Sequence, residues 1–150
     1  MTNYKLLVEK TLALANASRE PVPVMANVSA LLFESLEEIS WAGFYTVKGD
    51  VLLLGPFQGK VACVTIAKGK GVCGTAWAEN KTLVVPDVHA FPGHIACDST
   101  SRSEIVLPVR RDGQVFAVLD IDSRTPARFG KDDAAGLSEL VAALERIIGA

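Results

Sequence analysis

Apolar positions near both ends of the chain recur at the spacing of helices. Residues 4–14 and 24–36 place apolar side chains three and four positions apart, which predicts two helices. Pro21 and Pro23 lie between the two runs, so we expect a break there. The same spacing returns over residues 134–148, directly after two aspartates, and acidic residues favour the first turn of a helix. The pattern therefore predicts helices at both ends of the chain.

The middle of the chain consists of short runs of β-branched and aromatic residues, which are typical of strands. The expected strands cover residues 42–47, 51–57, 61–66, 83–85, 104–109 and 115–121. A glycine-framed segment over residues 72–79 predicts a short helix. Turns at 48–50 and at 111–114 join neighbouring strands, and the Asp-Gly pair of the second turn suits a tight hairpin. Helices around a mostly antiparallel sheet give an α+β fold.

Length, charge and apolar runs limit the classes of protein to which this chain can belong. The 150 residues predict one domain over residues 1–150. A net charge of −2 without a basic stripe argues against a nucleic-acid partner. No run approaches the ~20 apolar residues of a membrane span. Lysine and glutamate interrupt the apolar N-terminal run, so we expect no signal peptide and a cytoplasmic location.

The three cysteines are the first candidates for chemistry, because an odd number in a reducing compartment is not a static disulfide framework. Cys63 falls in an expected apolar strand, where a cysteine most often packs as a small hydrophobe. Cys97 lies in a long polar segment, residues 86–102, and connections of that length are often functional. Cys73 lies near the start of the short helix, whose N–H groups favour a thiolate. We therefore expect redox work from Cys97 and Cys73.

Three carboxylates form the second candidate group. Asp120 and Asp122 close an apolar strand two residues apart, so they share one face, and Glu104 begins another apolar strand. If the Asp-Gly turn pairs these strands, all three acids converge, and repulsion with partial burial raises at least one pKa. A carboxyl group with a raised pKa can donate a proton at neutral pH. The alternative is a solvated strand end that begins a turn.

Other side chains are less informative. His89 and His94 flank a Pro-Gly turn, and the chain has no zinc-type spacing of cysteine and histidine, so we expect no metal site. Trp41 and Tyr45 share one face of the first expected strand, which is either a core pattern or an aromatic wall with a polar rim.

The segments WAGFY, LLLGPFQGKVAC, GKGVCGTAW, VVPDVHAFPGHIACDSTSRSEIVLPV and VLDIDS, which lie between Trp41 and Ser123, resemble the free methionine-R-sulfoxide reductases. These enzymes belong to the GAF domain superfamily. The combination of GHIACD with SRSEIV and three cysteines in this order is specific to them. The resemblance implies a single GAF-type domain over residues 1–150.

By this resemblance Cys97 is the catalytic nucleophile, and Cys63 and Cys73 are both candidates for the resolving thiol. Glu104, Asp120 and Asp122 would hold and polarise the sulfoxide. The implied substrate-binding residues are Trp41 and Tyr45, which would line the methyl end, and Asp87, His94 and Ile95, in or beside a loop over residues 88–97 whose N–H groups would bind the substrate carboxylate.

The implied reaction converts free methionine R-sulfoxide to methionine. The Cys97 thiolate attacks the sulfur, a protonated carboxyl group, best placed in Glu104, protonates the leaving oxygen, and a second thiol converts the sulfenic acid to a disulfide. A thioredoxin-type dithiol would restore the enzyme, which needs no cofactor, and members of the family are typically homodimers.

Two other classes remain open on sequence grounds. A sensory GAF module would bind a small ligand and signal to an output domain, which we do not expect in a chain of this length. A redox sensor would oxidise Cys97 without producing methionine. Turnover of methionine sulfoxide separates both classes from the reductase.

Overall fold

The computed structural model describes residues 1–95 and 97–149. Its elements are α1 (Tyr4–Leu14), α2 (Pro21–Ser35), β1 (Trp41–Lys48), β2 (Val51–Gly59), β3 (Thr65–Ala67), α3 (Gly71–Glu79), β4 (Leu83–Val85), the 3-10 helix η1 (Val88–Ala90), β5 (Ser103–Arg111), β6 (Gln114–Ser123) and α4 (Lys131–Ile148). Within these described ranges, no helix combines the length and the apolar character that crossing a membrane requires.

The first turns of α2 and α4 show how the sequence begins these two helices. Pro21 and Pro23 lie in the first turn of α2, so the prolines start this helix instead of separating two helices. A proline is tolerated there because an N–H group in the first turn has no partner within the helix. At the start of α4 the backbone N–H of Gly130 donates to the side chain of Asp133 at 2.8 Å, which caps the helix as its acidic first turn predicted.

The sheet is antiparallel at every pairing and has the strand order β3-β2-β1-β6-β5-β4 over the described residues. The two-residue turn between β5 and β6 consists of Asp112 and Gly113, with φ values of 54° and 78°. Positive φ at both positions is the requirement of a tight hairpin turn, which confirms the role of the Asp-Gly pair. This turn places the start of β5 opposite the end of β6.

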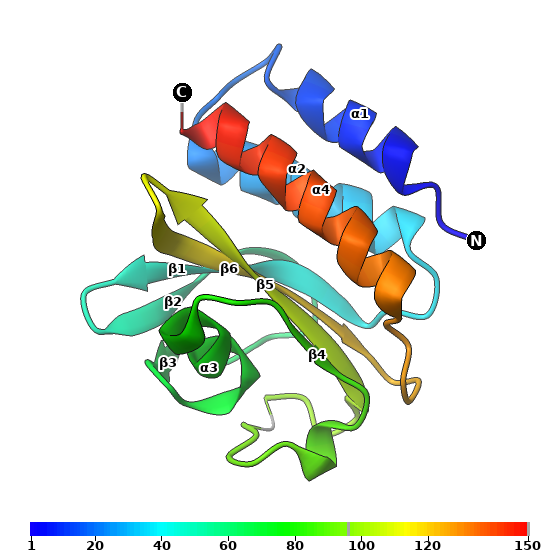
Figure 1. The fold of residues 1–150 in the computed structure, drawn as a ribbon, viewed down its shortest axis with the longest axis vertical. Coiled ribbons are helices and arrows are strands. Elements are labelled where there is room, and N and C mark those ends of the chain that lie inside the picture. Colours follow the sequence, from blue (N-terminus) through cyan, green and yellow to red (C-terminus); the bar gives the residue numbers. More distant parts are fainter. Residues whose placement is uncertain (96, 150) are drawn as a thin grey trace.

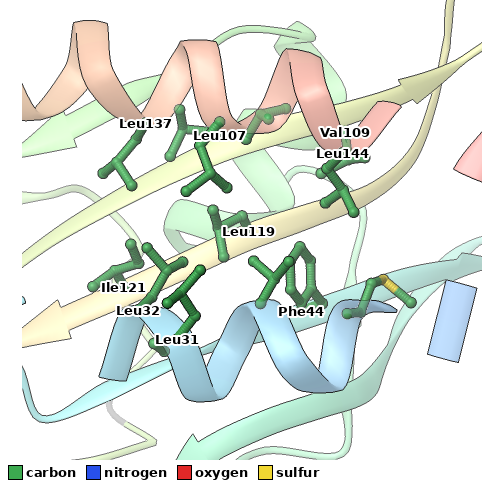
Figure 2. Packing of buried hydrophobic residues seen from close by; sticks show 14 of the residues in the cluster. Leu31, Leu32, Phe44, Leu107, Val109, Leu119, Ile121, Leu137 and Leu144 are labelled. Carbon is green, nitrogen blue, oxygen red and sulfur yellow. The ribbon is translucent and has the colours of Figure 1, made fainter. Parts of the chain in front are cut away.

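The helices α2 and α4 cover one face of the sheet and α1 packs against them, whereas α3 and the loop that contains η1 lie on the other face (Figure 1). The main core fills the space under the three helices, where Leu107, Leu119 and Phe44 from the strands meet Leu32 and Leu144 from the helices (Figure 2). Because side chains alternate along a strand, the residues between these positions face α3. The pocket described below lies on that second face.

Candidate active site

The three acids do converge, because the hairpin of β5 and β6 sets their register. Glu104 lies directly opposite Asp122, and Val106 lies opposite Asp120. Residues that alternate along paired strands share a face, so the three carboxyl groups project into one pocket. Glu104 is 7 % exposed and Asp120 is 5 % exposed. The alternative of a solvated strand end is therefore wrong.

Burial determines the protonation of this acid cluster, which we define as Glu104, Asp120 and Asp122. Desolvation, followed by the charge of Asp120, raises the pKa of both Glu104 and Asp122 well above their usual range. Desolvation also raises the pKa of Asp120, but hydrogen bonds from Glu104 and Asp122 oppose the shift. These effects favour the protonated form more strongly at Glu104 and Asp122 than at Asp120.

Cys73 is buried beside the acid cluster instead of being an exposed thiolate. Its Sγ atom donates to Oε2 of Glu104 at 3.9 Å. Desolvation, followed by the charges of Asp120 and Glu104, raises the pKa of the Cys73 thiol well above its usual range. The expectation that the N-terminus of α3 lowers this pKa is wrong, because burial next to carboxyl groups outweighs the helix dipole.

Cys63 and Cys97 form a disulfide bond, with their Cα atoms 5.6 Å apart. The predicted strand over residues 61–66 begins only at Thr65, so Cys63 lies in a loop between β2 and β3. Cys97 lies in the long loop before β5, which is irregular as predicted except for η1. The interpretation of Cys63 as a packed strand residue is therefore wrong.

The aromatic residues of β1 explain why the segment around Cys63 leaves the sheet. The indole Nε1 of Trp41 donates to the carbonyl oxygen of Lys60 at 3.1 Å, and the hydroxyl group of Tyr45 donates to the carbonyl oxygen of Cys63 at 3.1 Å. These bonds satisfy backbone groups that a strand partner would otherwise pair. The rings stack with centroids 5.9 Å apart and line the pocket, so they form an aromatic wall and also fix the loop that carries Cys63.

The long loop covers the pocket with two of its three predicted binding residues. His94 and Ile95 line the pocket, and Ile95 packs against Gly71, where an added Cβ atom would lie 3.2 Å from the Ile95 side chain. Desolvation, reinforced by His89, lowers the pKa of His94. Asp87 is not among the described residues that line the pocket; its carboxylate accepts from the N–H of His89 at 3.0 Å and caps η1.

The pocket encloses about 600 Å³ of empty space, its open mouth included. The residues that line it include four polar ones beyond those predicted, namely Lys60, Lys70, Asp98 and Ser101. Sequence reasoning missed these four residues. Both lysines lie beside glycines within the segments that carry the family resemblance. Their position in these segments is the sequence feature that could have indicated a place in the pocket. A floor of acids, an aromatic wall and a basic rim suit a small zwitterionic ligand.

The acid cluster predicts that stability falls as pH rises. An unfolded chain releases the Glu104 proton near a pKa of about 4.3, whereas the folded chain retains it to higher pH. Between these pKa values the folded state binds more protons, so the free energy of unfolding decreases by about 1.4 kcal/mol per pH unit for each retained proton. Urea unfolding of the oxidised protein between about pH 5 and pH 8 measures this slope.

Glu104→Gln is expected to flatten the slope, because the amide does not titrate. Glu34→Gln, at an exposed position of α2, is the matched control and is expected to keep the wild-type slope. Equal slopes for wild type and Glu104→Gln would show that Glu104 ionises normally in the folded chain.

The fold and the pocket define a GAF domain with cysteines and buried acids on one face of its sheet. The sequence matches the GAF domain family over residues 14–148. The chain is 56 % identical over 124 residues to a free methionine-R-sulfoxide reductase of Escherichia coli, an alignment that spans 83 % of this chain and 75 % of that protein.

Solved structures agree with this comparison. The reduced form of the Staphylococcus aureus protein named fRMsr superposes with a TM-score of 0.95 at 46 % identity, covering 99 % of this chain and 96 % of the other. The Neisseria meningitidis free methionine-R-sulfoxide reductase in complex with its substrate gives a TM-score of 0.93 at 44 % identity, covering 97 % and 87 %. The chain belongs to the free methionine-R-sulfoxide reductase family.

Proposed function

We propose that this protein reduces the R-sulfoxide of free methionine to methionine by thiol chemistry. Family membership supports the substrate and the reaction. The observation that carries the mechanism is the disulfide between Cys63 and Cys97 beside a pocket floored by protonated acids. A nucleophilic sulfur and a proton donor are the two groups that removal of a sulfoxide oxygen requires.

The first step oxidises Cys97 and reduces the substrate. The Cys97 thiolate attacks the sulfoxide sulfur, and the sulfoxide oxygen accepts a proton from Glu104. As the oxygen transfers to Cys97, the S–O bond of the substrate breaks, methionine leaves with an electron pair on its sulfur, and Cys97 becomes a sulfenic acid. Glu104 suits the role of proton donor because burial and the charge of Asp120 raise its pKa and favour the protonated form.

The second step uses Cys63 as the resolving thiol. Its sulfur attacks the sulfenic acid of Cys97, the disulfide forms, and the oxygen leaves as water with two protons. The bonded pair in this structure supports Cys63 over Cys73. Cys73 is buried, and its thiol donates to Glu104, so it is better suited to holding that carboxyl group than to forming a disulfide.

The pocket lining supports a position for each part of the substrate. The wall of Trp41 and Tyr45 would contact the methyl end, and the acid cluster would hold the sulfoxide oxygen and the ammonium group. Backbone N–H groups of the loop near His94 and Ile95 would bind the carboxylate. Asp87 would contribute by capping η1, the helix that begins this loop.

Regeneration requires an external dithiol, because the two thiols gave two electrons to the substrate when they formed the disulfide. An external reductant has to return these two electrons. A thioredoxin-type protein would attack the disulfide and leave with a disulfide of its own. Such reductants maintain thiols in the cytoplasm, which supports that location for this protein. The family resemblance supports a homodimer.

The test supplies the reduced protein with dithiothreitol and racemic free methionine sulfoxide, and resolves both epimers and methionine by chiral chromatography. We expect only the R epimer to disappear, with one methionine formed per sulfoxide consumed. Peptide-bound methionine sulfoxide is the matched control and should not react. If neither free epimer is consumed, the chain is a scaffold of this family that has lost its chemistry.

A further inference from the structure

The pocket contains a set of side-chain atoms that could bind a metal ion, whereas the proposed reaction uses no metal. One ligand atom each from Cys73, Glu104 and Asp120 lies within 4.8 Å of the other two. The three residues come from α3, β5 and β6, which are distant in sequence, so no local ligand spacing reveals them. Their exposed fractions are 4 %, 7 % and 5 %. The sequence has no zinc-type motif, but the fold brings three potential metal ligands together from separate elements.

A second observation points to a ligand at this position. Glu104 and Asp122 donate hydrogen bonds to the Asp120 carboxylate, but its buried Oδ1 atom has no hydrogen-bond partner among the described residues. A buried acceptor of this kind destabilises the folded chain as long as it stays unpaired. Its side chain lines the pocket together with Cys73 and Glu104, so the unpaired atom belongs to the same set of side chains.

We propose that Cys73, Glu104 and Asp120 form a binding site for a zinc ion, which blocks the pocket reversibly. A thiolate with two carboxylates is a ligand set for a borderline-soft divalent ion, and it disfavours Mg²⁺ and Ca²⁺, which prefer oxygen alone. Zinc binds sulfur at about 2.3 Å and carboxylate oxygen at about 2.0–2.2 Å, so its tetrahedral ligand atoms lie about 3.5 Å apart. The 3.9 Å between Cys73 Sγ and Glu104 Oε2 needs little closure.

Zinc binding would replace protons with a metal ion at this site. It would release the thiol proton of Cys73 and the carboxyl proton of Glu104, and the divalent cation would then lie between three anionic groups. Water from the open mouth of the pocket would complete the tetrahedron. Since Glu104 and Asp120 also hold the sulfoxide in the proposed function, a bound ion and the substrate exclude each other; only this consequence rests on the proposed function.

The experiment titrates Co²⁺, a spectroscopic substitute for zinc, into protein that carries the Cys63–Cys97 disulfide. The chain has three cysteines, so Cys73 is then the thiol left to bind metal. We expect a thiolate-to-cobalt charge-transfer band that saturates at one ion per chain and disappears when Zn²⁺ displaces the cobalt. Failure to develop the band would overturn the proposal.

Variants locate the ion. Asp120→Asn is expected to lower the Co²⁺ affinity roughly 100-fold or more, since even residues outside the ligand shell are worth about 10–100-fold. Cys73→Ser should abolish the charge-transfer band. Circular dichroism checks that both variants fold. If Cys73→Ser does not fold, the affinity of Asp120→Asn decides the question.

Glu79→Gln is the control, because Glu79 is an exposed acid on the same helix as Cys73, and this variant should bind Co²⁺ like wild type. Wild-type affinity in Asp120→Asn would place the metal elsewhere and refute the site.

Competition with the substrate separates this inference from the proposed function. Free methionine sulfoxide added to the Co²⁺-loaded protein should bleach the band. If the band forms and follows the variants as described but the sulfoxide does not displace the ion, the metal site stands and the proposed position of the substrate is wrong.

Discussion

Cys97→Ser is expected to lower the turnover of free methionine sulfoxide by roughly 10⁴-fold or more, because the serine hydroxyl group is a far weaker nucleophile than a thiolate. The substitution leaves the rest of the pocket in place. Substrate binding should therefore survive within a few-fold, as measured by calorimetry, while methionine formation stops. This separation of binding from turnover identifies Cys97 as the group that reacts.

A single-turnover experiment without reductant distinguishes the three cysteines. Reduced wild type should form one methionine per chain and end with the Cys63–Cys97 disulfide. Cys63→Ser should also form one methionine but end with a sulfenic acid on Cys97, which a carbon nucleophile traps for mass spectrometry. Cys73→Ser is the matched control and should form the same disulfide as wild type. A Cys73–Cys97 disulfide in the Cys63→Ser protein would instead make Cys73 the resolving thiol.

Glu104→Gln is expected to lower kcat about 10²–10⁴-fold, the range of a lost general acid. Glutamine keeps the shape and a hydrogen-bond donor but has no proton to transfer to the leaving oxygen. KM should change little, because the loss falls on the chemical step. Steady-state kinetics with dithiothreitol provide both constants.

The pH profile adds a second readout for Glu104. Wild-type activity should decline as pH rises through the raised pKa of the acid cluster, because the donor loses its proton. The remaining activity of Glu104→Gln should lack this decline, whereas Glu34→Gln should retain it. Wild-type kcat in Glu104→Gln would assign the proton to Asp122 or to solvent.

The acid cluster could be predicted from the sequence because it depends on two local rules. Strand alternation places Asp120 and Asp122 on one face, and the Asp-Gly turn sets the register that brings Glu104 opposite Asp122. Both rules concern residues close in sequence, so neither required knowledge of the rest of the fold.

The environments of Cys63 and Cys73 could not be predicted in this way, because residues distant in sequence determine them. The apolar run around Cys63 reads as a strand, but bonds from Trp41 and Tyr45 hold it as a loop beside the segment of Cys97. The start of α3 predicts a reactive thiol at Cys73, but β5 and β6 bury it against carboxyl groups. The local sequence pattern does not show which residues lie beside a cysteine across the sheet. It also does not show how far the folded protein buries that cysteine from solvent.

Strand alternation also divides the molecule into two sets of positions that natural selection can treat separately. In the paired segments 105–109 of β5 and 117–121 of β6 the odd-numbered residues, such as Leu107 and Leu119, pack under the helices, while Glu104 and Asp120 on the opposite face line the pocket. A mutation at a position under the helices is judged by the folding of the protein, and one at a pocket position by its chemistry. New ligands can therefore evolve on this sheet through changes at the pocket positions, while the core under the helices is inherited intact.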